Sequence, residues 1–115
     1  MKTILILEDE NKLSTILAKK LNTLGFKTLQ ASDGKEGLKL LTYNSVDLIL
    51  LDILMPNMDG HEFLNQLHDK HLNLPVIVLT NLDPVSIPSG VQKVLVKSNI
   101  SLEDIVTEIL YYLNP

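Results

Sequence analysis

The sequence predicts an α/β protein whose core is a doubly wound parallel β-sheet. Short apolar runs alternate with helical patterns along the chain, giving five strand–helix units. Most of these runs are apolar at almost every position, which is typical of strands that helices cover on both faces of a parallel sheet. The turn after the first run is not rich in glycine, which favours the flavodoxin-like strand order 2-1-3-4-5 over a dinucleotide-binding order.

Each predicted element has a local signal. The strands are expected at residues 3–7, 26–31, 46–51, 76–80 and 91–96. The first helix ends at Gly25 and carries an apolar stripe at helical spacing. This stripe consists of Leu13, Ile16, Leu17, Leu21 and Leu24. Asp33 and Glu36 form a capping box before the second helix, the third follows a loop after the central strand, and Ser101 with Asp104 caps the last.

A full fourth helix is not expected between the last two strands. Only residues 81–90 separate these strands, and they include Pro84, Pro88 and Gly90. Asp83 and Pro84 could begin one turn, which Pro88 would stop. We therefore expect a loop or a single turn, so that the fourth helix of this fold is short or absent.

Composition narrows the classes of function. The chain has 115 residues, of which 45% are hydrophobic, and we expect residues 1–115 to form a single domain. It lacks cysteine, which excludes disulfide scaffolds, thiolate metal sites and thiol nucleophiles. Its net charge is −4 and all ten basic residues are lysine, so direct binding of nucleic acid is not expected. No apolar run approaches the ~20 residues of a membrane span, and we expect a cytoplasmic protein without a membrane partner.

Polar side chains gather where the predicted strands end. Glu8 and Asp9 follow the first strand, Asp52 ends the third, Thr80 ends the fourth and Lys97 follows the fifth. The carboxyl ends of parallel strands share one edge of the sheet, where such folds bind ligands. Each residue alone has an ordinary explanation as a turn, cap, strand or surface residue. Three carboxylates on one edge, however, repel one another unless a cation is bound.

The chemistry of these side chains favours Mg²⁺ as that cation. All the candidate ligands are oxygens, and Mg²⁺ retains several waters and often shares a phosphoryl group. Two of the carboxylates and a backbone carbonyl near Leu54 would leave positions for water and a phosphate oxygen. The ammonium group of Lys97 and the hydroxyl of Thr80 suit the remaining oxygens of a phosphoryl group.

These residues resemble the pattern of receiver domains of two-component response regulators, and the resemblance covers the whole chain. The run Ile-Leu-Ile-Leu-Glu-Asp-Glu at residues 4–10 resembles the first strand and acidic pair of the family. Residues 47–60, with Asp52 at the end of the apolar run, resemble its phosphorylation-site signature. The strand ends at Thr80 and Lys97 are similar to the ends of its fourth and fifth strands.

The resemblance implies phosphotransfer signalling with Mg²⁺ as the cofactor. Asp52 would take a phosphoryl group from a sensor histidine kinase or a phosphotransfer protein, and Lys97 and Thr80 would bind the phosphoryl oxygens. The implied metal ligands are Glu8 (directly or through water), Asp9, Asp52 and the Leu54 carbonyl. The domain would be the substrate and catalyst of its own modification, not a conventional enzyme, and a downstream effector domain or protein would read the modified state.

Three positions depart from the family pattern. Ser98 follows Lys97 where most receivers have a proline in a cis bond, so we expect a trans bond or a strained turn that affects the reach of Lys97. Asn81 stands where the family favours a small residue beside the phosphoryl site. Val94 replaces the usual aromatic switch residue, so the usual rearrangement of that aromatic side chain with Thr80 is not expected.

Two other functions fit parts of the pattern. A degenerate receiver would keep the acidic edge as a remnant of its fold and act as a phosphorylation-independent docking module. A Mg²⁺-dependent phosphatase would have an Asp-x-Asp pair after the first strand, but Asn11 stands two residues after Asp9. Incubation with acetyl phosphate and Mg²⁺ separates the three functions, because they predict a stable adduct, no adduct and turnover respectively.

Overall fold

The computed structural model describes residues 1–53, 60–70, 72–81 and 90–113. Its elements in chain order are β1 (Thr3–Leu7), α1 (Asn11–Thr23), β2 (Lys27–Ala31), α2 (Gly34–Tyr43), β3 (Leu48–Leu51), α3 (Gly60–Asp69), β4 (Val76–Thr80), β5 (Lys93–Val96), the 3-10 turn η2 (Lys97–Asn99) and α4 (Leu102–Leu113). The helix predicted to be short or absent between β4 and β5 is a different segment from α4. It falls mainly on residues 82–89, which lie outside the described residues. Among the described helices, none is long and apolar enough to cross a membrane.

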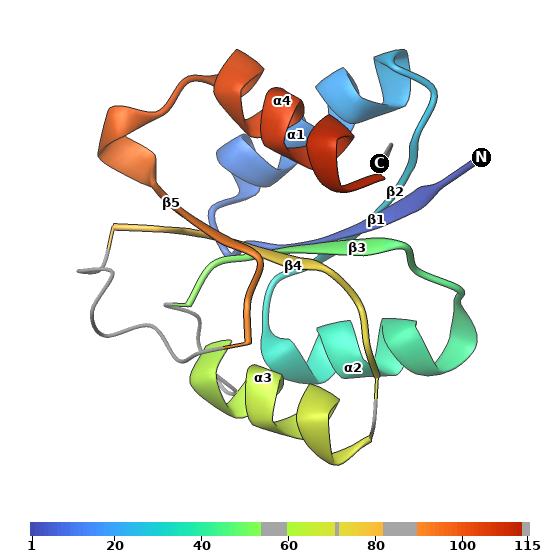
Figure 1. Ribbon diagram of the computed structural model, residues 1–115. Helices are drawn as coiled ribbons and strands as arrows, with labels where there is room; N and C mark the ends of the chain where they lie inside the picture. The colour runs from blue at the N-terminus through green and yellow to red at the C-terminus, as the bar shows by residue number, and fades with distance from the viewer. Residues whose placement is uncertain (54–59, 71, 82–89, 114–115) are drawn as a thin grey trace.

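The five strands form one parallel sheet in the order β2-β1-β3-β4-β5, which confirms the predicted flavodoxin-like order. Helices α1 and α4 cover one face of this sheet, and α2 and α3 cover the other (Figure 1). The three central strands are buried at every position, as predicted. The edge strands β2 and β5 expose some side chains, because each has a neighbouring strand on one side only.

The hydrophobic core has two halves, one on each face of the sheet. Consecutive residues of a strand point to opposite faces, so each central strand contributes to both halves. In β1, Ile4 and Ile6 pack in the half that includes α1 and α4, while Leu5 and Leu7 pack in the half that includes Phe63 of α3. The central strands are thereby held from both sides, which fixes the position of their carboxyl ends.

The buried face of α1 differs from the predicted stripe. Its buried residues are Ser14, Leu17, Ala18 and Leu21. Ile16 and Leu24 are 52% and 45% exposed, so the prediction was wrong at these two positions. The helix turns the small side chains of Ser14 and Ala18 toward the sheet, and hydrophobicity alone did not identify them as inward-facing.

Strands β3 and β5 each begin two residues later than predicted, because side chains take part in the ladder at their amino ends. The Asp47 N–H donates to the Thr3 carbonyl at 2.8 Å, and Asp47 Oδ2 accepts from the Thr3 N–H at 2.8 Å. The Gln92 N–H donates to the Val76 carbonyl at 2.9 Å, and Gln92 Oε1 accepts from the Val76 N–H at 2.6 Å. Regular pairing therefore starts only after these residues, in β3 and β5 respectively.

The predicted helix starts at Asp33 and Ser101 are confirmed. Oδ1 of Asp33 accepts from the Glu36 N–H at 2.9 Å at the start of α2. At the start of α4, Ser101 Oγ accepts from the Asp104 N–H at 3.1 Å and Asp104 Oδ2 accepts from the Ser101 N–H at 3.2 Å. This reciprocal pair is a capping box, and it sets where the chain re-enters a helix after η2.

Candidate functional site

The predicted site lies at the carboxyl edge of the central strands. Glu8 directly follows β1 and Asp52 directly follows β3, and the last residues of these neighbouring strands, Leu7 and Leu51, are paired. Main-chain hydrogen bonds extend the ladder one residue further, because the Asp52 N–H donates to the Leu7 carbonyl at 2.9 Å and the Glu8 N–H donates to the Ala31 carbonyl at 3.0 Å. The sheet itself, therefore, positions both acidic residues.

The structure brings together the three carboxylates that the sequence placed at this edge. One oxygen from each of Glu8, Asp9 and Asp52 lies within 4.8 Å of the other two. Glu8 and Asp52 are 3% and 5% exposed, whereas Asp9 is exposed to solvent. The group therefore combines two desolvated carboxylates with one that faces water.

Lys97 supplies the positive charge of the site. Its Nζ lies 2.7 Å from Oε1 of Glu8 and 3.0 Å from Oδ2 of Asp52. Lys97 begins η2 directly after β5, and none of the peptide bonds among the described residues is cis. The bond to Ser98 is therefore trans, one of the two expected outcomes, and Lys97 reaches both carboxylates from this turn.

Burial and charge shift the ionisation of the two most enclosed groups. The pKa of Glu8 is raised from 4.5 to about 7, mainly because the side chain is buried. The neighbouring charge of Asp52 also raises this pKa, whereas the contacts with Lys97 and the Glu10 amide lower it. Burial on its own would lower the pKa of Lys97, but its contacts with Glu8 and Asp52 outweigh this effect and raise that pKa above 10.5. Lys97 is thus cationic at neutral pH, while Glu8 is close to its titration midpoint.

The second oxygen of Glu8 is fixed by the main chain. Oε2 accepts from the Glu10 N–H at 3.1 Å. Oε1 is buried and lies 2.7 Å from the Lys97 ammonium, with which it forms an ion pair. A buried oxygen with spare acceptor capacity is a suitable metal ligand.

The remaining predicted positions lie on the same edge or outside the described residues. Thr80 is the last residue of β4, fully buried, and pairs with Val96, the residue before Lys97. Asn81 follows it and is exposed. The Leu54 carbonyl, the predicted fourth metal ligand, lies outside the described residues.

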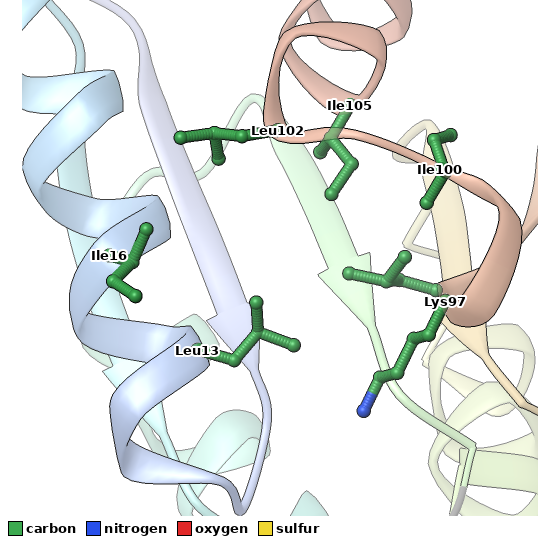
Figure 2. A pocket seen from close by; sticks show the side chains of 7 residues that line it. Leu13, Ile16, Lys97, Ile100, Leu102 and Ile105 are labelled. Atoms are coloured by element: carbon green, nitrogen blue, oxygen red, sulfur yellow. The ribbon is translucent and has the colours of Figure 1, made fainter.

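The aliphatic stem of Lys97 forms part of an apolar cavity between α1 and the start of α4 (Figure 2). This cavity has a volume of about 120 Å³, and its other lining residues are Leu13, Ile16, Leu79, Ile100, Leu102 and Ile105. The long stem of a lysine packs well on such a surface while its charged end remains in a polar environment. Lys97 thereby borders the cavity while its Nζ reaches the two carboxylates.

Sequence reasoning missed Ser14 and Gln30, which line a polar cavity together with Glu8. Ser14 of α1 is buried, and its Oγ donates to Oε1 of Gln30 in β2 at 2.9 Å. A serine among the inward positions of a helix was the available signal, because a buried hydroxyl requires a partner. The spacing from Ser14 to Leu17, Ala18 and Leu21 shows that inward face.

A divalent cation fits the residues present. The donors are all oxygens, two of the carboxylates are desolvated, and Asp9 faces solvent, from which a hydrated ion would arrive. Mg²⁺ is typically held by one or two carboxylates and keeps several waters, which matches a site that is partly open. Glu8, Asp9 and Asp52 are the described residues that would hold it.

Similar proteins carry this architecture. Residues 4–109 match the response regulator receiver domain family. The receiver domain of the Francisella response regulator 1452 superposes with a TM-score of 0.89 at 30% identity, covering 97% of this chain and 96% of that one. The Thermotoga maritima response regulator TrrA, solved in complex with Mg²⁺-BeF, superposes with a TM-score of 0.85 at 25% identity, covering 97% and 99%.

Two curated relatives extend beyond the matched region. The alkaline phosphatase synthesis transcriptional regulatory protein PhoP of Bacillus subtilis is 39% identical over 82 residues, which are 71% of this chain and 34% of PhoP. The sensor histidine kinase RcsC of Salmonella typhimurium is 36% identical over 77 residues, or 67% of this chain and 8% of RcsC. The chain thus spans about a third of the length of the transcriptional regulators it matches. On the strength of the family match, the sheet order and the acidic edge, the chain belongs to the response regulator receiver domain family.

Proposed function

We propose that this receiver domain is the phosphoacceptor of a two-component system and that Asp52 receives the phosphoryl group. The observation that carries the assignment is the position of Asp52. Its buried carboxylate directly follows the central strand β3, 3.0 Å from the Lys97 ammonium and within 4.8 Å of oxygens from Glu8 and Asp9. A nucleophile with a fixed cation beside it and metal ligands around it suits phosphoryl transfer, which depends mainly on positioning and charge neutralisation.

The transfer is a nucleophilic displacement at phosphorus. A carboxylate oxygen of Asp52 attacks the phosphorus of a phosphohistidine on the partner, the P–N bond breaks, and its electron pair leaves with the imidazole, which is protonated from water. The product is an acyl phosphate on Asp52. Mg²⁺ supplies positive charge for the phosphoryl oxygens when bound. Lys97 would exchange its contact with Oδ2 for one with a phosphoryl oxygen, and Thr80 would donate its hydroxyl from the end of β4.

The domain is proposed to be a modified substrate and not a conventional enzyme, since one phosphoryl group remains on its own side chain. Its proposed donor is a sensor histidine kinase or a phosphotransfer protein, which is supported by the similarity to part of RcsC. The similarity to transcriptional regulators supports a DNA-binding effector as the output, located in the cytoplasm. We assign no DNA contact to this domain itself, because it carries a net charge of −4 and no arginine.

Acetyl phosphate with Mg²⁺ tests the assignment. The wild-type protein and an Asp69→Asn control, altered at an exposed residue of α3, should gain the mass of one phosphoryl group. Asp52→Asn should gain none. An adduct of wild-type extent on Asp52→Asn would show that another residue accepts the group.

The second candidate function is a docking module that acts without phosphorylation. The exposed, polar Asn81 beside the site and Val94 in place of an aromatic residue favour it, because both depart from the family pattern. It predicts that the wild-type protein shows no adduct with either acetyl phosphate or a phosphorylated kinase, although Mg²⁺ still binds.

A further inference from the structure

Ser14 forms a hydrogen bond that leaves its own helix. Three helical threonines, Thr23, Thr42 and Thr107, donate to the carbonyl four residues earlier, at 2.9, 3.0 and 2.9 Å. Ser14 is 3% exposed on the inward face of α1, and its Oγ donates instead to Oε1 of Gln30 in β2 at 2.9 Å. The threonines thus bond within one helix, whereas Ser14 joins α1 to the edge strand.

This bond is connected to the acidic edge through main-chain contacts. The Ser14 N–H donates to the Glu10 carbonyl at 3.0 Å, and the Glu10 N–H donates to Oε2 of Glu8 at 3.1 Å. The Glu8 N–H is bonded to Ala31, the residue after Gln30. The turn from Glu8 to Glu10 is therefore held between β2 and the first turn of α1.

The first turn of α1 needs such a fixed point because it lacks a side-chain cap. Glu10 occupies the N-cap position and its side chain makes no capping hydrogen bond, in contrast to Asp33 before α2 and Ser101 before α4. An uncapped first turn leaves main-chain donors unsatisfied and frays more readily. Glu8, Ser14 and Gln30 also line one polar cavity of about 220 Å³, so the bond lies in the wall of a cavity that Glu8 shares.

We propose that Ser14 and Gln30 are positioning residues for the divalent cation site. Their hydrogen bond fixes the turn that carries Glu8 and Asp9, and thereby sets the affinity of the domain for Mg²⁺. The inference rests on one part of the proposed function, namely that a cation binds the carboxylates of Glu8, Asp9 and Asp52. Residues that hydrogen-bond a metal ligand directly typically change metal affinity by about 10- to 100-fold, and a bond one step further away should have a smaller effect.

Titration with MgCl₂, followed by amide NMR shifts of the isotope-labelled protein, tests this role. Ser14→Ala and Gln30→Met should each raise the Mg²⁺ dissociation constant roughly 3- to 10-fold. The double variant should bind Mg²⁺ no more weakly than the single variant with the lower affinity, because all three variants lose the same Ser14–Gln30 hydrogen bond. The Glu10 amide resonance should also shift in the metal-free variants. Gln30→Met alters an exposed position, so it remains informative if Ser14→Ala folds poorly.

Thr28→Val is the matched control. Thr28 Oγ1 donates to Oδ1 of Asn22 at 3.0 Å, which joins α1 and β2 at the end away from the site. It should leave the dissociation constant unchanged, although it also removes a side-chain hydrogen bond between α1 and β2, a more exposed one. If the Mg²⁺ dissociation constants of Ser14→Ala and Gln30→Met lie within about twofold of that control, the positioning role is overturned. The metal site itself would still stand in that case, because the wild-type protein would still bind Mg²⁺. Failure of the wild-type protein to bind Mg²⁺ would overturn both.

Discussion

The Lys97 ammonium lies 3.0 Å from Oδ2 of Asp52, which joins the end of β5 to the end of β3 across the intervening strand β4. The same Nζ is 2.7 Å from Oε1 of Glu8 after β1. One lysine thus compensates two buried carboxylates from two different strands. The stability and the chemistry of the site are expected to depend on this one cation.

Lys97→Met should destabilise the metal-free protein at neutral pH. Removing one partner of a buried ion pair leaves an uncompensated charge, and we expect a loss of about 2–4 kcal/mol in the free energy of unfolding. Added Mg²⁺ should restore part of this loss, because it supplies the missing positive charge. Urea denaturation with and without Mg²⁺ measures both effects. Lys93→Met is the control, since its ion pair with Glu108 is longer, at 3.8 Å, and more exposed. An equal loss there would contradict the assignment.

The raised pKa of Glu8 predicts a pH dependence of stability. The pKa is about 7 in the folded protein and near 4.5 when unfolded, so between these values the folded state binds a proton that the unfolded state has released. Without Mg²⁺, this group should therefore make the free energy of unfolding fall by about 2 kcal/mol as pH rises from 5 to 8. Glu8→Gln should flatten that slope in urea denaturation at a series of pH values. A slope identical to wild type would show that Glu8 titrates normally.

Asp9→Ala should weaken Mg²⁺ binding with little change in stability. Asp9 is exposed, so its removal should change the free energy of unfolding by less than about 0.5 kcal/mol, whereas the loss of one of three ligands should raise the Mg²⁺ dissociation constant by roughly tenfold or more. Labelling by acetyl phosphate should slow in parallel. Glu10→Ala is the neighbouring control, because Glu10 contacts Glu8 through its main-chain N–H. Equal Mg²⁺ affinities of the two variants would contradict the role of Asp9.

Asn81→Ala should shorten the lifetime of the phosphorylated protein. Asn81 is exposed directly after Thr80, and its side chain is larger than the residue favoured in the family at this position. A smaller side chain should open the path of the water that hydrolyses the acyl phosphate. The decay of the phosphorylated mass after removal of acetyl phosphate gives the half-life, with Asn65→Ala in α3 as an exposed control. A half-life equal to or longer than wild type would show that Asn81 does not restrict water.

The fold and the acidic edge could be predicted because they depend on strong, repeated signals. Uninterrupted apolar runs identified the three central strands, and three carboxylates at strand ends identified the edge where they converge. The strand limits were less accurate, because a sequence pattern does not show that the side chains of Asp47 and Gln92 take part in the ladder. The inward position of Ser14 and the unusual ionisation of Glu8 arise from three-dimensional packing between elements. The predictions for residues 82–89 and the Leu54 carbonyl stay predictions.

The two ends of the sheet differ in how their hydrogen bonds are made, and this affects what each end can tolerate. At the amino end, the side chains of Asp47 and Gln92 complete the ladder, so a substitution there removes a bond of the sheet. At the carboxyl end, Glu8 and Asp52 join the ladder through their main-chain N–H groups, which any residue except proline retains. Mutational change can therefore alter the reactivity of the carboxyl end while the architecture persists, whereas the amino end is under constraint from folding.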